Sequence, residues 1–381
     1  MQVAVVYNPT AGGGEAQRVL DVSVRPALEK NQVQATYHAT EAEHGARRVG
    51  RHVFESGSGA LTVVVLGGDG TAHELLDGMA GERGFPLARP VSLVLVPTGT
   101  ANALYASLFS PDMEKDGWQL HSLQALVDNK APSALTVMQV AVPGEPKHFA
   151  CVVASQALHA AILRDSEALR ASHPGIERFK IAAQQNMTAW SDAELVLYPG
   201  KCGVQQYNPH TKSFEELAEA EMDGVVVDGP FVYMNAMTVD RLEPQFVPAP
   251  FASAHYSTEL HRGSDQLDVI VVRPRRSPAL QHDEISEGER EQFASGPLAQ
   301  VMFQGMYKNG VHVDFVYAKD GSVQPSGDGA PVVEYFRAAG YEWRPEASDA
   351  KAGTTCIDGT VINASLTHVT ADGQCGVSVY Q

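Results

Sequence analysis

Cysteine, cationic charge and long apolar runs are the features that this chain has least of. Its 381 residues include 4 cysteines and no Cys-x-x-Cys pair, so the sequence predicts neither a zinc ribbon nor a disulfide framework. Lysine and arginine number 28 against 45 acidic residues, and the net charge of −17 argues against a nucleic-acid partner. Any membrane contact must therefore be apolar or local. No apolar run approaches the length of a membrane span.

Three familiar motifs are also missing. The Gly-Lys-Ser/Thr of a Walker loop does not occur, and His73 stands where a dinucleotide fingerprint beginning at Gly68 needs its last glycine. The pair His73-Glu74 does not open a zinc-protease helix, because Asp77 occupies the place of the second histidine. These classes of site are therefore excluded.

Length and the start of the chain give two further expectations. A chain of 381 residues exceeds what one hydrophobic core usually covers, so we expect two domains. Residues 3–7 form an apolar strand-like run, without the basic segment and apolar core of a secretory signal. Together with the scattered cysteines, this predicts a cytoplasmic protein.

The most informative stretch is an apolar run at residues 63–66 that ends in Gly67, Gly68 and Gly70 around Asp69 and continues into a helical segment. Glycines allow tight turns and the close approach of a phosphate to backbone N–H groups. A carboxylate beside phosphates is repelled unless a metal ion or a transferable proton gives it a role. No capping role accounts for the three glycines, so we interpret Asp69 as a catalytic residue.

Three similar units surround this one in the first third of the chain. Strand-like runs precede the loop Asn8-Pro9-Thr10, the residue Thr40 and the loop Pro97-Thr98-Gly99-Thr100-Ala101-Asn102, and helical segments follow them. Repeated strand–loop–helix units predict an α/β, Rossmann-like domain with a mainly parallel sheet, over residues 1–131. Because ligands of such sheets lie beyond the carboxyl ends of the strands, we expect these loops to converge on one site.

From about residue 132 the pattern changes to short apolar runs broken by turns, which predicts a mainly antiparallel β-sandwich over residues 132–381. Polar stretches near 201–223 and 275–292 are expected to be exposed loops. One helical stripe, with Phe179, Ala183 and Met187 among its members, interrupts the strands. Such a stripe indicates core packing more often than the wall of a lipid site.

The loops at Asn8, Asp69 and Pro97 resemble, in order and spacing, three signatures of the diacylglycerol kinase catalytic domain family. That family includes sphingosine and ceramide kinases and is distantly related to NAD kinases and phosphofructokinases. The resemblance implies an ATP- and Mg²⁺-dependent lipid kinase that phosphorylates a hydroxyl of a diacylglycerol-, ceramide- or sphingoid-like lipid. It also implies a C-terminal β-sandwich that holds the acceptor lipid, and peripheral membrane contact.

The same resemblance implies the roles of particular residues. Asp69 would act as general base and would contact the metal through water, and Arg170 and Arg178 would reach the phosphates from the second domain. Asp358 would close the nucleotide side. The full set expected to bind nucleotide and phosphate is Asn8, Pro9, Thr10, Thr40, Gly67, Gly68, Gly70, Thr71, Glu74, Thr98, Gly99, Thr100, Asn102, Arg170, Arg178 and Asp358.

Two departures from the family leave alternatives open. Residues 158–164 lack the carboxylate with which sphingosine kinases meet an amine, which favours a neutral acceptor such as diacylglycerol or ceramide, because a buried amine without a counter-charge is costly. Thr360 stands where the family usually has glutamate. A soluble-metabolite kinase of the NAD kinase type and a non-catalytic nucleotide- or lipid-binding relative remain alternatives. The sequence does not determine the oligomeric state.

Overall fold

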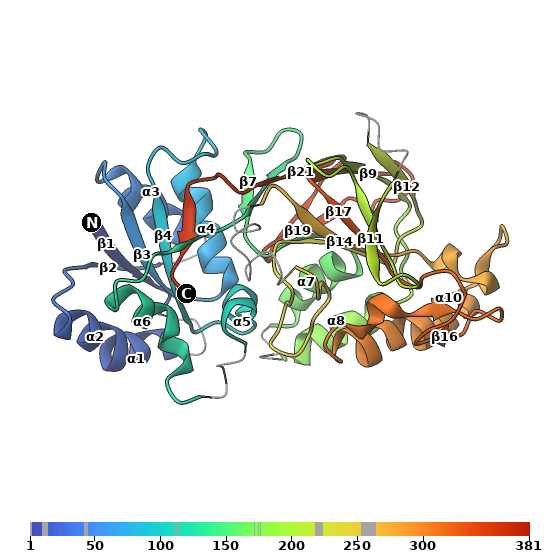
Figure 1. The fold of residues 1–381 in the computed structure, drawn as a ribbon, viewed down its shortest axis with the longest axis horizontal. Helices are drawn as coiled ribbons and strands as arrows, with labels where there is room; N and C mark the ends of the chain where they lie inside the picture. Colours follow the sequence, from blue (N-terminus) through green and yellow to red (C-terminus); the bar gives the residue numbers. More distant parts are fainter. Residues whose placement is uncertain are drawn as a thin grey trace.

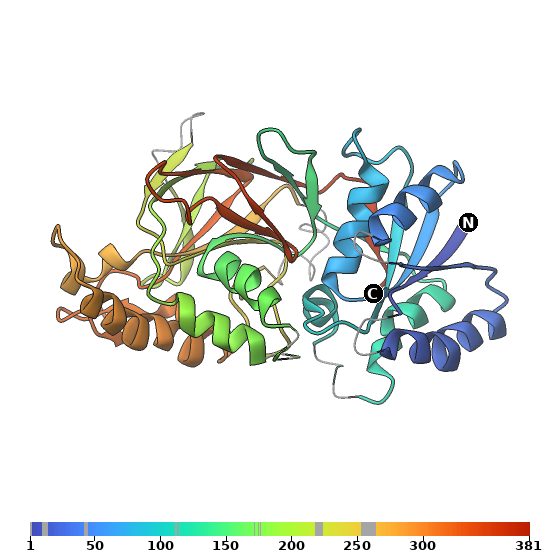
Figure 2. The ribbon, with the colours of Figure 1, turned by 180° about the vertical axis from the view of Figure 1, so that it is seen from behind.

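The computed structural model describes residues 2–9, 14–41, 45–110, 113, 115–170, 172–173, 175, 177–217, 224–252 and 264–381. The chain forms an α/β unit and a β-rich unit that lie side by side along the long axis of the molecule (Figure 1 and, from behind, Figure 2). Among the described residues, no helix combines the length and the apolarity that crossing a membrane requires.

The α/β unit is built on a six-stranded sheet with the order β2-β1-β3-β4-β22-β5. Its first four strands are parallel: β1 (Gln2–Tyr7), β2 (Thr36–Ala39), β3 (Leu61–Gly67) and β4 (Val91–Pro97). Every residue of β3 is buried, as expected for a strand of a parallel sheet covered on both faces. The predicted α/β, mainly parallel class is therefore confirmed.

Helices cover both faces of this sheet. On one face lie α3 (Gly45–Glu55) and α4 (Asp69–Ala80), whose apolar residues share a core with the alternate strand positions Val63 and Val65. On the other face, α1 (Glu15–Val19), η2 (Leu20–Val24), α2 (Arg25–Lys30) and α6 (His121–Val127) pack with Val64 and Leu66. Two further helices, α5 (Ala103–Phe109) and η4 (Trp118–Leu120), complete the unit.

The second unit consists of two antiparallel sheets, so the predicted β-sandwich is confirmed. One has the order β11-β10-β17-β14-β13-β8-β19-β20 and the other β12-β9-β18-β21-β6-β7. The bounds of the first are β11 (Ser213–Glu216), β10 (Gln205–Asn208), β17 (Glu334–Ala338), β14 (Leu267–Val272), β13 (Tyr233–Met237), β8 (Val153–Ala157), β19 (Thr354–Ile357) and β20 (Thr360–Asn363). Those of the second are β12 (Val225–Asp228), β9 (Ala193–Tyr198), β18 (Gly340–Pro345), β21 (Thr367–Asp372), β6 (Val137–Ala141) and β7 (His148–Ala150).

Buried residues of both sheets, Leu195 and Val269 among them, form one core between the layers. Two groups of helices lie on one side of this sandwich (Figure 1). The first is α7 (Leu158–Ala168) with α8 (Glu177–Asn186). The second runs through α10 (Glu287–Phe293), η7 (Ala294–Leu298), η8 (Gln300–Met306) and η9 (Val311–Asp314).

The range expected for the second domain, residues 132–381, begins and ends with a strand that belongs to the first unit. Strands β5 (Ser133–Ala134) and β22 (Val377–Val379) belong to the sheet of the α/β unit, where β22 pairs in parallel with β4. The end of the chain therefore returns to the first unit (Figure 1). Sequence pattern could not show this, because a three-residue strand carries no information about its partner.

The two polar stretches are not simply loops. Within 201–223, β10 and β11 form an antiparallel hairpin whose Tyr207 and Phe214 rings lie 5.5 Å apart; residues 218–223 lie outside the described residues. Within 275–292, two short helices, η5 (Pro274–Arg276) and η6 (Pro278–Leu280), precede α10. A capping box of Ser286 and Glu289 begins α10. The polar composition of these stretches therefore predicted exposed loops, but an edge hairpin forms in the first and a capped helix forms in the second.

Removing two methyl groups from Val379 tests whether β22 stabilises the first unit. Val379 is 0% exposed, so we expect Val379→Ala to lower the free energy of unfolding by about 2 kcal/mol in denaturant titration. Val22, which is 65% exposed, offers a matched control, and Val22→Ala should change that free energy by less than about 0.5 kcal/mol. Equal effects of the two substitutions would contradict the assignment.

Candidate active site

The glycine–aspartate loop joins β3 to α4, and its glycines serve close packing. Gly68 is extended, with φ −103°, and none of the three glycines has a positive φ. A Cβ on Gly67 would lie 2.5 Å from Thr71 Oγ1, and a Cβ on Gly99 would lie 2.5 Å from the Cα of Gly68. The loops after β3 and β4 therefore touch backbone to backbone, as their convergence at one sheet edge predicted.

Asp69 connects these two loops through its carboxylate. Oδ2 accepts a hydrogen bond from the backbone N–H of Ala103 at 2.7 Å, and Oδ1 accepts one from Leu104 at 3.0 Å. Asp69 therefore also caps α5, a helix that is distant in sequence. Each oxygen keeps a further lone pair for another donor. Burial raises the pKa of Asp69, although the amides of Leu104 and Ala103 oppose this effect.

A second carboxylate faces the same region from the other unit. Asp358, in the turn between β19 and β20, accepts hydrogen bonds from the backbone N–H groups of Cys151 at 2.6 Å, Val152 at 3.1 Å and Val153 at 2.7 Å. Burial raises the pKa of Asp358 to about 6, and the charge of Asp69 adds to this rise. A carboxylate whose pKa is raised in part by the charge of a second carboxylate marks a region suited to a cation.

Several of the predicted loop residues build the shape of the site. Asn102 holds its loop closed, because Oδ1 accepts from the N–H of Gly99 at 3.0 Å and Nδ2 donates to its carbonyl at 2.9 Å. The Oγ1 atom of Thr98 is buried and has no hydrogen-bond partner among the described residues. Glu74 accepts a hydrogen bond from the N–H of Ala46 at the start of α3. It therefore contacts the start of α3, and its predicted role at a phosphate stays a prediction.

Other predicted residues lie at the same sheet edge. The backbone N–H of Asn8 donates to Leu66 at 3.1 Å, and that of Thr40 donates to Tyr7 at 2.9 Å. Pro9 follows Asn8 at the end of β1, whereas Thr10 lies outside the described residues. Gly70 and Thr100 line a cavity together with Asp69. The structure thus brings the described loop residues to one edge and leaves their ligand contacts as predictions.

Arg170 and Arg178 come together on Glu167 instead of Asp69. Arg170 Nη2 donates to Glu167 Oε2 at 2.7 Å, and Arg178 Nη1 lies 4.0 Å from the same oxygen. Arg178 is buried, its Nε lacks a partner, and burial lowers its pKa. A role of the pair on phosphates remains a prediction.

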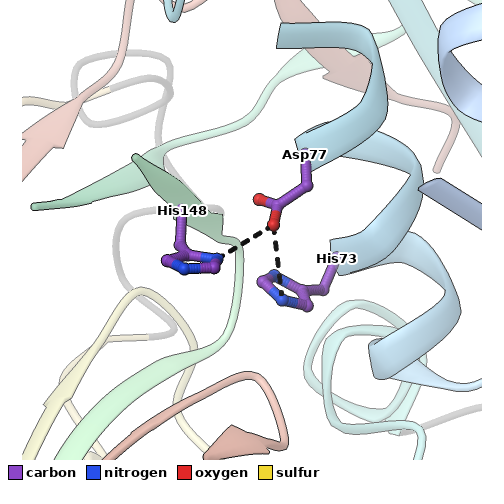
Figure 3. A group of neighbouring side chains, drawn as sticks. All are labelled: His73, Asp77 and His148. Carbon is purple, nitrogen blue, oxygen red and sulfur yellow. Dashed lines mark hydrogen bonds and ion pairs between the residues drawn. The ribbon is translucent and has the colours of Figure 1, made fainter. Parts of the chain in front are cut away.

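The sequence analysis missed a buried cluster formed by His73, Asp77 and His148 (Figure 3). Asp77 Oδ2 lies 3.1 Å from His148 Nδ1 and 3.9 Å from His73 Nε2, and Asp77 Oδ1 accepts from the N–H of Phe149 at 2.8 Å. Asp69, His73 and Asp77 follow one another at intervals of four residues, so they share one face of α4. That spacing was a signal that could have identified the cluster.

This cluster joins the two units and needs no metal ion. Three such side chains could hold one. However, the guanidinium of Arg47 contacts Asp77 Oδ2 and lies 3.4 Å from His148 Nδ1, so a cation already occupies that position. His73 donates from Nδ1 to the Phe149 carbonyl at 2.7 Å, and its Nε2 lies 3.0 Å from Thr360 Oγ1. The unusual Thr360 is therefore a contact between the units.

A cavity of about 750 Å³ opens beside Asp69. Gly68, Asp69, Gly70, Asp358 and Gly359 line one part of it. Mostly apolar side chains line the rest: Val152, Val153, Ile162, Leu163, Phe179, Ala183, Met187, Tyr233, Leu242, Phe246, Met302 and Phe303. Such a volume and lining are typical of a site for a small apolar ligand.

The interpretation of the helical stripe as core packing is wrong for three of its members. Phe179, Ala183 and Met187 line the cavity from α8, whereas Trp190 is buried against Phe293 with the ring centres 6.1 Å apart. Ile176 lies outside the described residues. Helical spacing places residues on one face but does not determine what that face meets.

Comparison with known proteins agrees with this geometry. Residues 2–140 match the family model of the diacylglycerol kinase catalytic domain. Over 107 residues the chain is 34% identical to sphingosine kinase 1 of Homo sapiens, covering 28% of this chain and 27% of that protein. Over 108 residues it is 32% identical to a diacylglycerol kinase of Staphylococcus saprophyticus, covering 28% of this chain and 32% of that protein. The matches span about a third or less of these relatives.

The fold is shared over a much longer range. A solved structure of a diacylglycerol kinase from Bacillus anthracis str. Sterne superposes with a TM-score of 0.54 at 12% identity, covering 100% of this chain and 97% of that one. At this identity the likeness shows the fold alone. The resemblance to the diacylglycerol kinase family is thus confirmed for residues 2–140, and both units share the fold of a solved diacylglycerol kinase.

The coupling between Asp69 and Asp358 can be measured by carbon-detected NMR titration. We expect Asp358 to titrate near pH 6, and we expect its pKa to fall in Asp69→Asn because a neighbouring negative charge is removed. Because the folded state holds this proton more tightly than the unfolded chain, the contribution of Asp358 to stability should fall as pH rises from about 4 to about 6. An Asp358 pKa that Asp69→Asn leaves unchanged would show that the two carboxylates are independent.

Proposed function

We propose that this protein is a lipid kinase that transfers the terminal phosphoryl group of ATP, with Mg²⁺, to a hydroxyl of a diacylglycerol-, ceramide- or sphingoid-like lipid. The proposal rests on the position of Asp69. It lies where the glycine loops meet a largely apolar cavity of about 750 Å³. A soluble nucleotide acceptor would not match walls of this kind, which disfavours a kinase of the NAD kinase type.

The residues at the sheet edge fit a nucleotide and a metal ion. The Thr98 hydroxyl is buried without a hydrogen-bond partner among the described residues, and the loops of Gly68 and Gly99 can approach this closely only because neither glycine has a Cβ. The carboxylates of Asp69 and Asp358 offer the oxygen ligands that Mg²⁺ prefers, directly or through water. Bound MgATP would supply the phosphoryl group and neutralise its charge.

The chain itself would provide orientation and a base. The first N–H groups of α4, a helix of 12 residues, point toward the loop and favour an anion there. Asp69 is held by two amides and retains lone pairs that can accept the proton of an acceptor hydroxyl. Its raised pKa strengthens it as a base. The apolar walls would exclude water from the reacting groups.

The lining of the cavity is compatible with a sphingoid base as the acceptor, in addition to a neutral lipid. His159, within the stretch that lacks a carboxylate, lines the wall and lies with Nδ1 2.7 Å from Ser155 Oγ; burial lowers its pKa to about 4, so it is neutral at pH 7. Glu243 also lines the cavity and arrives from a distant segment. It could meet an amine, so a sphingoid base stands beside the neutral lipids as an acceptor.

Phosphate transfer with an Asp69→Asn blank tests the proposal. Labelled ATP with Mg²⁺ would be offered to micellar diacylglycerol, ceramide, sphingosine and monoacylglycerol, with NAD as soluble acceptor. We expect label in one lipid, and we expect Asp69→Asn to lower turnover by at least about 100-fold because the base is lost. The substitution should also lower the melting temperature, since an amide nitrogen would face the donor of Ala103 or Leu104.

A second buried carboxylate on α4 provides the control for that loss of stability. Asp77 does not line the cavity, so Asp77→Asn should destabilise the fold while keeping turnover per folded molecule within about tenfold of the native value. Label in NAD alone would replace the lipid kinase with a soluble-metabolite kinase. ATP binding without label in any acceptor would favour the non-catalytic alternative.

Filling the cavity tests where the lipid binds. Ala183 lines it from α8, so Ala183→Trp should reduce lipid turnover at least about tenfold while leaving the Kd for ATP unchanged, because the bulk is placed on the acceptor side. Gln185 is exposed on the same helix and lies outside the lining, so Gln185→Trp is the matched control. Equal lipid kinetics in the two variants would exclude this cavity as the acceptor site.

A further inference from the structure

The cavity beside Asp69 has exposed residues at two separate places. Gly70 and Thr100, together with Gly359 beside Asp358, are exposed on the side of the glycine loops. Away from these loops, the exposed lining residues come from α8, from the segment after β13, and from η8 and the residue that follows it. They are Lys180, Gln184, Gln245, Phe303 and Tyr307. The second opening therefore lies where α8 and η8 meet the surface.

Exposed large apolar side chains are concentrated in residues 303–311, the segment that contributes Phe303 and Tyr307 to this opening. In the described part of the chain, five large hydrophobic side chains are exposed, and three of them come from residues 303–311: Phe303 at 58%, Tyr307 at 37% and Val311 at 46%. The other two, Val22 and Val226, lie on η2 and β12. A large aromatic side chain such as Phe303 is rarely left this exposed without a partner surface.

The aromatic residues extend from the surface into the cavity. The rings of Phe303 and Tyr307 are stacked, with centres 6.3 Å apart and planes at 10°, and Tyr307 contacts Phe246 with ring centres 4.7 Å apart. All three rings line the cavity. An apolar chain moving through this opening would therefore meet apolar side chains continuously from the outer surface to the interior.

We propose that residues 303–311, with the adjoining mouth between α8 and η8, dock on the surface of a lipid bilayer. This inference rests on the proposed function, because a lipid acceptor resides in a bilayer and must enter the cavity without exposing its chains to water. The net charge of −17 gives no general attraction to an anionic surface, so insertion of Phe303, Tyr307 and Val311 would supply the binding. Acyl chains could then remain in the bilayer through this mouth while the hydroxyl reaches Asp69.

Sedimentation with vesicles tests the surface without any phosphate transfer. The full chain would be mixed with zwitterionic phosphatidylcholine vesicles that contain no acceptor lipid, without ATP. We expect binding that 0.5 M NaCl leaves unchanged, and we expect Phe303→Ser to weaken it about tenfold because a half-exposed aromatic ring no longer enters the bilayer. Val311→Ser should weaken it in the same direction, and Val311 does not line the cavity.

Exposed valines elsewhere provide the matched controls. Val226→Ser and Val22→Ser remove apolar side chains that are 52% and 65% exposed on distant elements, so they should leave vesicle binding unchanged. Absence of vesicle binding by the native chain, or an equal loss in the Val226→Ser variant, would overturn the proposal. The proposal would also be overturned if Phe303→Ser converted a dimer to a monomer and left vesicle binding unaltered. That result would show that residues 303–311 contact a second copy of the chain.

The two proposals fail in different measurements. Vesicle binding that depends on Phe303 and Val311, with no label in any lipid, would support the docking surface and refute the kinase. Label in a lipid, with equal vesicle binding in native and Phe303→Ser proteins, would support the kinase and refute the surface.

Discussion

The hydrogen bonds between the Asp69 carboxylate and the first amides of α5 are the constraint on which the rest of the site depends. They join the end of β3 to the loop after β4 at the point where Gly68 and Gly99 touch. Because both oxygens are held, the carboxylate has one orientation, with its remaining lone pairs available to a ligand. The same residue is thus a structural cap and the candidate base, so its loss affects stability and chemistry together.

A second set of contacts places the β-rich unit against this loop. Asp358 is held by three consecutive amides, and the turn that carries it is joined to α4 through Thr360 and His73. Asp77 adds a further connection to β7, with Arg47 compensating its charge. The buried carboxylates are paired, which is how such groups can lie between two units without a large energetic cost, whereas Arg47 Nε and His148 Nε2 have no partner among the described residues. They fix two carboxylates from different units beside one cavity.

The lining of the cavity determines which kind of ligand the site can hold. Its walls come from α7, α8, η8 and the sandwich, whereas its polar part comes from the loops of the first sheet. A ligand that fills both parts must combine a group that reaches Asp69 with an apolar body. The exposed aromatic residues at the mouth between α8 and η8 extend this apolar path to the surface, where a bilayer would continue it.

Much of the fold, and the convergence of the described loops at one edge of the sheet, could be predicted from the sequence. The β-branched runs determined the strands, and the position of Asp69 after one of them placed it at the edge where parallel strands present their ligands. Contacts between distant segments could not be predicted. The pairing of Val379 beside Leu93, the approach of Glu243 to the cavity and the cap that Asp69 gives to α5 depend on the packing of the whole chain.

The stripe of Phe179, Ala183 and Met187 shows most clearly what could not be predicted from the sequence. Its helical spacing determined by itself that these residues share one face, because local backbone geometry sets that period. Only the tertiary structure decided that this face borders a cavity instead of a core, because that depends on which elements pack opposite it. The sequence by itself therefore determined the local elements and the residue types at their ends, and the packing of the two units decided what those residues meet.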